Sequence, residues 1–186
     1  IHKELWKSKS EVYAFIFDLQ KALAFPKLTC SISYYKRNLY SYNLGCHDLA
    51  TDVGFMYVWH ETIVLRGSQK VSACIVKHIK QVASMKKHII MYSDACTGQN
   101  RNFKMALSSL KLVLDPAFQI EVIDHISMVS GQSYFPNDSE FGAVEPHAKG
   151  KATYTSTDWY DIIAHSWRKM PFTVIQMKQE EFLCTE

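Results

Sequence analysis

Several common signatures are missing from this sequence. No apolar run approaches the roughly 20 residues that span a bilayer, and the charged first residues do not form a secretory signal peptide. The 186 residues include only 7 glycines and 5 prolines, so collagen-like and low-complexity structures are excluded. Walker A, G-x-G-x-x-G and G-x-S-x-G motifs are also absent. No membrane partner is expected, and a serine hydrolase is not supported.

Cysteine is present, but not in a pattern that supports disulfides or zinc. The five cysteines are odd in number and include no C-x-x-C pair. This argues against a disulfide framework and a zinc finger, and it predicts a reducing, intracellular compartment. The net charge of +3 permits a polyanionic partner without requiring one.

The pattern of apolar residues predicts one α/β domain over residues 1–186. The continuous runs Val12–Phe17 and Ile89–Tyr92 are typical of strands buried on both faces, and we expect them to be adjacent and parallel in a central, mixed, five-stranded sheet. An early antiparallel meander followed by β-α-β units predicts helices on both faces of this sheet. Because the chain starts at Ile1 rather than Met, we expect it to be part of a longer protein. The remaining expected strands are 28–35, 39–44, 53–59, 120–129 and 172–177. The expected helices are 68–85, 102–114, 138–144 and 156–167. The apolar side of the second of these helices is expected to consist of Phe103, Ala106, Leu107, Leu110 and Val113.

Both of the buried strands end in an aspartate. Asp18 follows the first and Asp94 follows the second. Neighbouring strands lie about 4.8 Å apart, so the two carboxylates would share one small volume, which disfavours ionisation unless a cation compensates. Mg²⁺ or Mn²⁺ would suit such oxygen ligands and would support phosphoryl transfer. A turn or helix cap is the alternative role for each aspartate, and the pattern alone leaves the two roles open.

A third acid is expected from the C-terminal half, and Asp138 is the first choice. It follows the loop 131–137, which leaves a strand near the predicted carboxylates. Glu145 would lie about 10 Å further along a helix that begins near residue 139. Glu140 neighbours Phe141, which is expected to face the core, so Glu140 should point elsewhere. An N-cap role for Asp138 stays open.

Secondary candidates have weaker signals. Glu61 follows a strand and either joins the site or is exposed, and exposure is favoured. The polar turn Gly98-Gln99-Asn100-Arg101-Asn102 opens a helix, and it either holds a phosphate through its amides and Arg101 or caps that helix. His60, His125 and His147 lack metal-ligand spacing.

Three segments resemble the DUF7869 family, a domain of unknown function found in insects and other eukaryotes that looks like a transposase-derived, RNase H-like domain. They are Phe17–Gln20, Tyr92–Asn102 and Val129–Asp138 with Phe141-Gly142. The resemblance implies an RNase H-like fold and acids at Asp18, Asp94 and Asp138. Many relatives carry Gly-His-Thr/Ser where this chain has Gly131-Gln132-Ser133, and the change to Gln132 weakens the expectation of catalysis.

The expected function is a metal-dependent nuclease or polynucleotidyl transferase-like activity on nucleic acid, DNA rather than RNA, in the nucleus. Asp18, Asp94 and Asp138 would be both metal ligands and catalytic residues. The alternative is a domesticated, inactive module of the same fold that binds nucleic acid or protein. A small-molecule phosphohydrolase would also use strand-end aspartates, but the early antiparallel meander fits it poorly.

Overall fold

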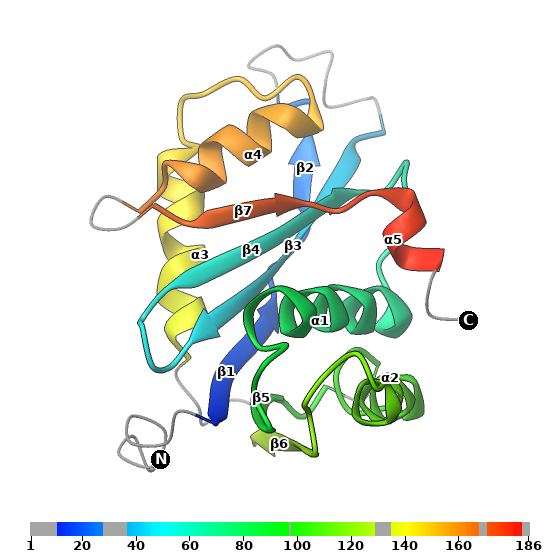
Figure 1. Cartoon of the computed structure of the whole chain (residues 1–186). Helices are drawn as coiled ribbons and strands as arrows, with labels where there is room; N and C mark the ends of the chain where they lie inside the picture. The colour runs from blue at the N-terminus through cyan, green and yellow to red at the C-terminus, as the bar shows by residue number, and fades with distance from the viewer. Residues whose placement is uncertain (1–10, 28–36, 97, 129–134, 168–170, 184–186) are drawn as a thin grey trace.

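The fold is organised around one mixed β-sheet (Figure 1). The computed structural model describes residues 11–27, 37–96, 98–128, 135–167 and 171–183. Strands follow the order β6-β5-β1-β3-β4-β7, and β2 pairs with β3 off this path. The strands are β1 (Val12–Leu19), β2 (Leu23–Phe25), β3 (Leu39–Asp48), β4 (Gly54–His60), β5 (His88–Asp94), β6 (Val122–Met128) and β7 (Thr173–Gln176).

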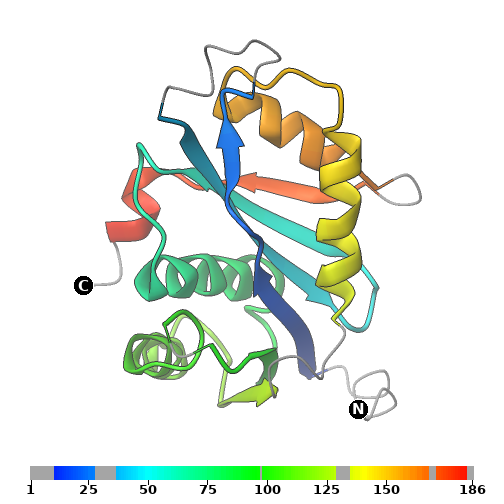
Figure 2. The same ribbon diagram turned by 180° about the vertical axis from the view of Figure 1, so that it is seen from behind.

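Helices cover both faces of the sheet (Figures 1 and 2). The face seen in Figure 1 carries α1, with α2 and α5 packed against it. The opposite face, turned forward in Figure 2, carries α3 and α4. Within the described residues, no helix is both long and apolar enough to cross a membrane. The helices are α1 (Ser68–Val82), α2 (Phe103–Leu114), α3 (Pro136–His147), α4 (Ser156–Ala164) and α5 (Gln179–Leu183).

The expected pairing of the two apolar strands is confirmed. β1 and β5 are adjacent and parallel, with Val12 opposite His88 and Ile16 opposite Tyr92. The expected count of five strands is wrong, because the sheet has seven. The strand that was not expected is β2, only three residues long, whereas β7 matches the strand expected at 172–177 and pairs in parallel with β4. The expected strand at 28–35 lies outside the described residues.

Alternate residues of the central strands enter two different cores. Tyr13, Phe15 and Phe17 of β1 join a large apolar cluster with α1, α2 and α5. Ala14 and Ile16, which point the other way, pack instead with Tyr92 and Phe135. The sheet therefore separates an aromatic core on the α1 side from a second packing layer on the α3 side.

The apolar side of α2 is mostly exposed to solvent. Phe103 is 77% exposed and Leu110 is 52% exposed. Met105 and Leu112 are the residues of this helix that are buried. The sequence pattern marked the amphipathic helix correctly, but α2 packs against α1 with a different side. We attribute this to its position at the edge of the layer, where α1 is the main helical neighbour.

A glycine on β3 allows α3 to approach the sheet closely. Gly45 lies opposite Asp18 in the antiparallel β1–β3 pair. A Cβ atom at this position would lie 2.6 Å from Asn137 Nδ2 and 2.9 Å from Phe141 Cε1. Contacts this short do not occur for real side chains, so the absence of a side chain here permits the observed approach of the helix.

Candidate active site at the ends of β1 and β5

The strand register places Asp18 and Asp94 side by side. Ile16 and Tyr92 form the last pair of this register, and Asp18 and Asp94 each follow two residues later on the same two strands. Ile16 and Tyr92 belong to the same apolar cluster as Phe135, the residue that precedes α3. Because side chains alternate along a strand, the two aspartates face the same side as these residues. The first turn of α3 therefore adjoins both carboxylates.

Asp18 is the carboxylate whose protonation is most affected by this arrangement. The pKa of Asp18 is raised to about 6, mainly by burial and in addition by the negative charges of Asp94 and Asp138. A hydrogen bond from the Leu19 backbone N–H acts in the opposite direction but does not offset burial. Within the described residues, none of the three aspartates forms an ion pair. In this part of the chain, the site therefore combines three acids without an ion-paired positive side chain.

Asp94 is held in place by the turn that follows β5. Asn100 donates a short hydrogen bond from Nδ2 to Asp94 Oδ1, and the backbone N–H of Cys96 donates to the same oxygen at 3.3 Å. Asn100 is fully buried, and its Oδ1 has no hydrogen-bond partner among the described residues. Asn100 thus fixes the orientation of the carboxylate and leaves an unused acceptor beside it.

Asp138 has a structural role in addition to its position near Asp18. Helix α3 begins at Pro136, three residues earlier than the residue 139 expected from sequence. The Phe135 backbone N–H donates to Asp138 Oδ2 at 2.8 Å, so this carboxylate closes the first turn of the helix. The residue is exposed. One oxygen serves the helix end while the charge still acts on Asp18.

The turn at Gln99-Asn100-Arg101 directs its amides to the chain itself, and the residue after it caps helix α2. The backbone N–H groups of Gln99, Asn100 and Arg101 all donate to Cys96 O, at 3.3, 2.8 and 3.1 Å. Asn102 caps α2 by accepting from the Met105 N–H at 3.1 Å. Arg101 is exposed. Of this turn, Asn100 is the residue that contacts a candidate acid.

Glu61 and Glu145 lie away from the three aspartates. The Glu61 side chain is only 6% exposed and accepts from Arg37 at 3.1 Å, so the expectation of an exposed side chain is wrong. Its N–H donates to Tyr40 O, five residues along β3 from Gly45, or about 17 Å. Glu145 is exposed near the end of α3 and lines a surface groove. Gln132 lies outside the described residues.

A buried histidine–glutamate pair was missed by the sequence interpretation. His47 Nδ1 lies 2.7 Å from Glu140 Oε1, and His47 Nε2 lies 3.2 Å from Asp52 Oδ1. Glu140 is 5% exposed, so the expectation that it points away from the core is wrong. Burial lowers the pKa of His47, but the hydrogen bond and charge of Glu140, together with Asp52, raise it above its usual value overall. The alternation of polar and apolar residues along β3 was the available signal for a polar buried face.

No preformed metal cage is present in the described part of the chain. There, no group of three or more histidine, cysteine, aspartate and glutamate side chains is arranged to hold a metal ion. Asp94 and Asp138 are close enough to Asp18 to raise its pKa, but the three carboxylates do not form a closed coordination shell.

Comparisons with known proteins give little to add. No family model matches the sequence, and no curated protein matches it. One similar solved structure is a chain of the cryo-electron-microscopy structure of the simian T-cell lymphotropic virus intasome in complex with PP2A regulatory subunit B56 gamma, with 9% identity and a TM-score of 0.49. The match covers 91% of this chain and 54% of that chain, so this chain spans about half its length. A similarity at this level supports no functional conclusion.

Proposed function

We propose that this chain is an RNase H-like, transposase-derived domain of the DUF7869 kind that carries out metal-dependent phosphodiester chemistry on nucleic acid, with DNA as the favoured substrate and the nucleus as its location. Asp18, Asp94 and Asp138 would be the functional acids. The observation that carries the proposal is the raised pKa of Asp18, which results from burial and from the charges of the other two acids.

The strand arrangement supports the RNase H-like part of the proposal. Three antiparallel strands, β1, β3 and β4, are continued on the other side of β1 by the parallel strands β5 and β6. In α/β sheets, functional groups collect beyond the carboxyl ends of such strands.

The donor set fits a hard divalent cation. Mg²⁺ and Mn²⁺ prefer carboxylate oxygens and retain water in their remaining positions. Asp18 and Asp94 would hold the ion, and Asp138 would supply its free oxygen from the first turn of α3. The bound ion would polarise a phosphate and lower the pKa of a water molecule. Asn100 would keep Asp94 oriented, since it already donates to that carboxylate.

The second candidate function is a binding module without turnover. Two observations favour it: Asp138 already uses one oxygen to close the first turn of α3, and the described residues contain no preformed three-ligand site. Such a module would keep the fold and its affinity for nucleic acid or protein. It would show no cleavage with any metal.

A combined binding and cleavage experiment tests the proposal. Mn²⁺ is titrated calorimetrically into the wild type and Asp94→Asn, and cleavage of single-stranded and branched DNA is followed with Mn²⁺. We expect Asp94→Asn to lose Mn²⁺ binding. We also expect Asp138→Ala to lose cleavage, whereas the matched variant Glu145→Ala on the same helix keeps it.

Three outcomes separate the alternatives. Equal Mn²⁺ binding by the wild type and Asp94→Asn would rule out the metal site. Loss of cleavage in Glu145→Ala with retention in Asp138→Ala would transfer the third position to Glu145. A wild type that binds DNA but cleaves nothing under any metal would establish the binding module instead.

A further inference from the structure

A basic groove begins next to the candidate active site. It encloses about 790 Å³ between the ends of β2, α3 and α4. Its lysines are Lys21, between β1 and β2, Lys27, after β2, and Lys149, after α3. All three are exposed, and within the described residues none of them forms an ion pair with an acid. Glu145 is the acid that lines the same groove.

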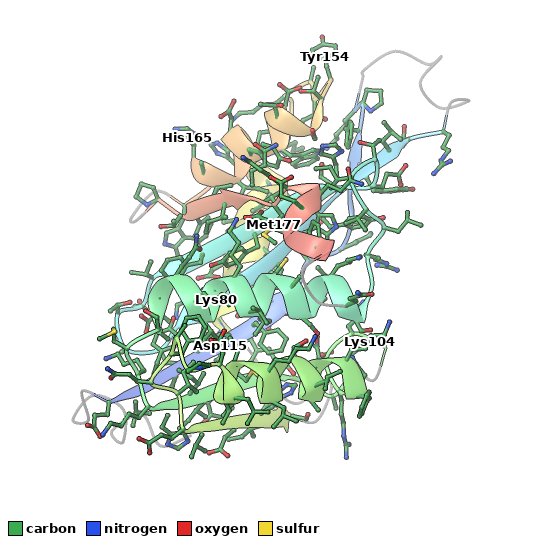
Figure 3. The ribbon with its side chains drawn as sticks, turned by 45° about the vertical axis from the view of Figure 1, so that its right-hand side comes forward. Lys80, Lys104, Asp115, Tyr154, His165 and Met177 are labelled. Carbon is green, nitrogen blue, oxygen red and sulfur yellow. The ribbon has the colours of Figure 1, made fainter. Side chains whose placement is uncertain are left out.

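The floor of the groove is apolar. Leu23, Ala24 and Trp159 contribute to its lining, and Leu23 and Trp159 are almost completely buried. The Trp159 indole N–H donates to Ala24 O at 3.2 Å, which locks the ring between β2 and α4. Beside Lys27, which pairs with Thr153, the side chain of Tyr154 is 65% exposed and stands out from the surface in Figure 3. Positive charge thus lies next to apolar and aromatic surface.

The groove and the three aspartates share the same two elements. Lys21 follows Asp18 by three residues on the chain, and Gly142, which lines the groove, lies one turn after Asp138 on α3. The four helical residues from 138 to 142 advance about 6 Å along the axis at about 1.5 Å per residue, so this end of the groove lies close to Asp138. A strand that lies in the groove can therefore reach the carboxylates without leaving the surface.

We propose that this groove binds a single strand of DNA and leads it to the carboxylates at the ends of β1 and β5. The part of this inference that leads the strand to the carboxylates rests on the proposed function, whereas binding of the strand in the groove does not depend on metal or cleavage. Lysines would contact phosphates, and the apolar floor would contact sugars and bases, as in other single-strand grooves. A duplex stacks its bases inside and would leave the apolar floor unused. An acidic peptide would complement the charge of the lysines, but it would not explain why the groove continues toward the three aspartates.

Binding of a fluorescein-labelled oligothymidylate of about 16 nucleotides, measured by anisotropy in EDTA, tests the groove separately from catalysis. The triple variant Lys21→Gln/Lys27→Gln/Lys149→Gln should bind roughly 10- to 100-fold more weakly, and the slope of log K against log salt should fall by about 2. Glu145→Gln removes a repulsive charge and should bind about twofold more tightly.

The matched control is Lys80→Gln/Lys104→Gln/Lys111→Gln. It removes the same charge from α1 and α2, where Figure 3 shows Lys80 and Lys104 far from Tyr154. We expect the control to retain nearly wild-type affinity, and thermal unfolding should show that both triple variants are folded.

Four results would overturn the groove proposal. They are a wild type that does not bind the oligonucleotide, a groove variant that binds as tightly as the wild type, a control that loses as much affinity as the groove variant, and competition by polyglutamate as effective as competition by unlabelled oligonucleotide. Wild-type binding that depends on the groove lysines, together with no cleavage under any metal, would leave the groove established and reject only the catalytic proposal.

Discussion

The two faces of the sheet take alternate residues of the same strands, yet they differ in chemistry. On β3, Tyr42, Leu44 and Cys46 enter the aromatic core on the α1 side. Ser41 and Asn43, which alternate with them, are just as fully buried but polar. The α1 face is mainly aromatic and aliphatic, whereas the α3 face combines an apolar cluster with carboxylates, a histidine and amides. We conclude that stability depends mainly on one face and function on the other. Substitutions on the two faces should therefore differ in their effects on stability and on metal binding.

The largest effect should follow from a cavity in the apolar face. Phe15 is 0% exposed and lies at the centre of the aromatic cluster. We expect Phe15→Ala to lower the free energy of unfolding by about 3–5 kcal/mol, as measured by urea denaturation. The contrasting variant is Ser41→Ala, because the buried Ser41 hydroxyl has no hydrogen-bond partner among the described residues. Its replacement should be neutral or stabilising, and a loss as large as that of Phe15→Ala would remove the distinction between the faces.

Asp18→Asn should stabilise the protein while abolishing metal binding. The folded pKa of about 6 lies above the ordinary value of 3.8. A raised folded pKa gives stability that is present below pH 3.8 and is lost as pH rises through about 6. Removing the charge should therefore increase the free energy of unfolding by up to about 3 kcal/mol at pH 7.5 without metal. Denaturation in EDTA across this pH range measures the gain. A destabilised Asp18→Asn variant would mean that the carboxylate has a structural role instead.

Glu140→Gln should weaken the buried polar pair on the α3 face. The loss of a charged hydrogen bond to His47 should cost about 1.5–3 kcal/mol. Because the folded pKa of His47 is raised, its contribution is present below its unfolded pKa and is lost as pH rises through the folded value. Denaturation of both proteins between pH 5 and 9 should show that this slope disappears in the variant. An unchanged slope would mean that His47 does not titrate with Glu140.

The smallest effects are expected in the turn after β5. Asn100→Ala removes the side chain that holds Asp94, and Asn102→Ala removes the cap of α2. Each should cost about 1 kcal/mol of stability. The two variants should differ in Mn²⁺ titrations, where only Asn100→Ala is expected to weaken binding. Equal Mn²⁺ affinities would assign Asn100 to the turn alone.

Local patterns predicted the strands that carry Asp18 and Asp94 because both are long apolar runs with the same polar ending. The sequence also predicted that these two strands are neighbours, because the carboxyl ends of parallel strands meet at the same edge of a sheet. β2 could not be recognised, because three residues give no measurable periodicity. The side of α2 that faces the core could not be predicted either, because it depends on which element the helix packs against.

The candidate site was predictable only where its residues belong to strand ends. His47 and Glu140 are 93 positions apart, and nothing in the local sequence of either one reveals the other. Asp138 illustrates a different difficulty. Its position after a loop predicted both a cap and a ligand, and the cap role is the one its hydrogen bond displays. Whether it is also a ligand depends on charge and distance, which a sequence does not contain.

Gly45 sets the distance between the sheet and helix α3 at the candidate site. It contributes no functional atom, but the missing side chain determines how far α3, and with it Asp138, stands from Asp18 on the neighbouring strand. A methyl group at position 45 would collide with Asn137 and Phe141 and would push helix α3 away from the sheet. Position 45 should therefore be as intolerant of substitution in a selection for activity as the aspartates themselves, and a mutational map would mark it as functional although it touches no ligand.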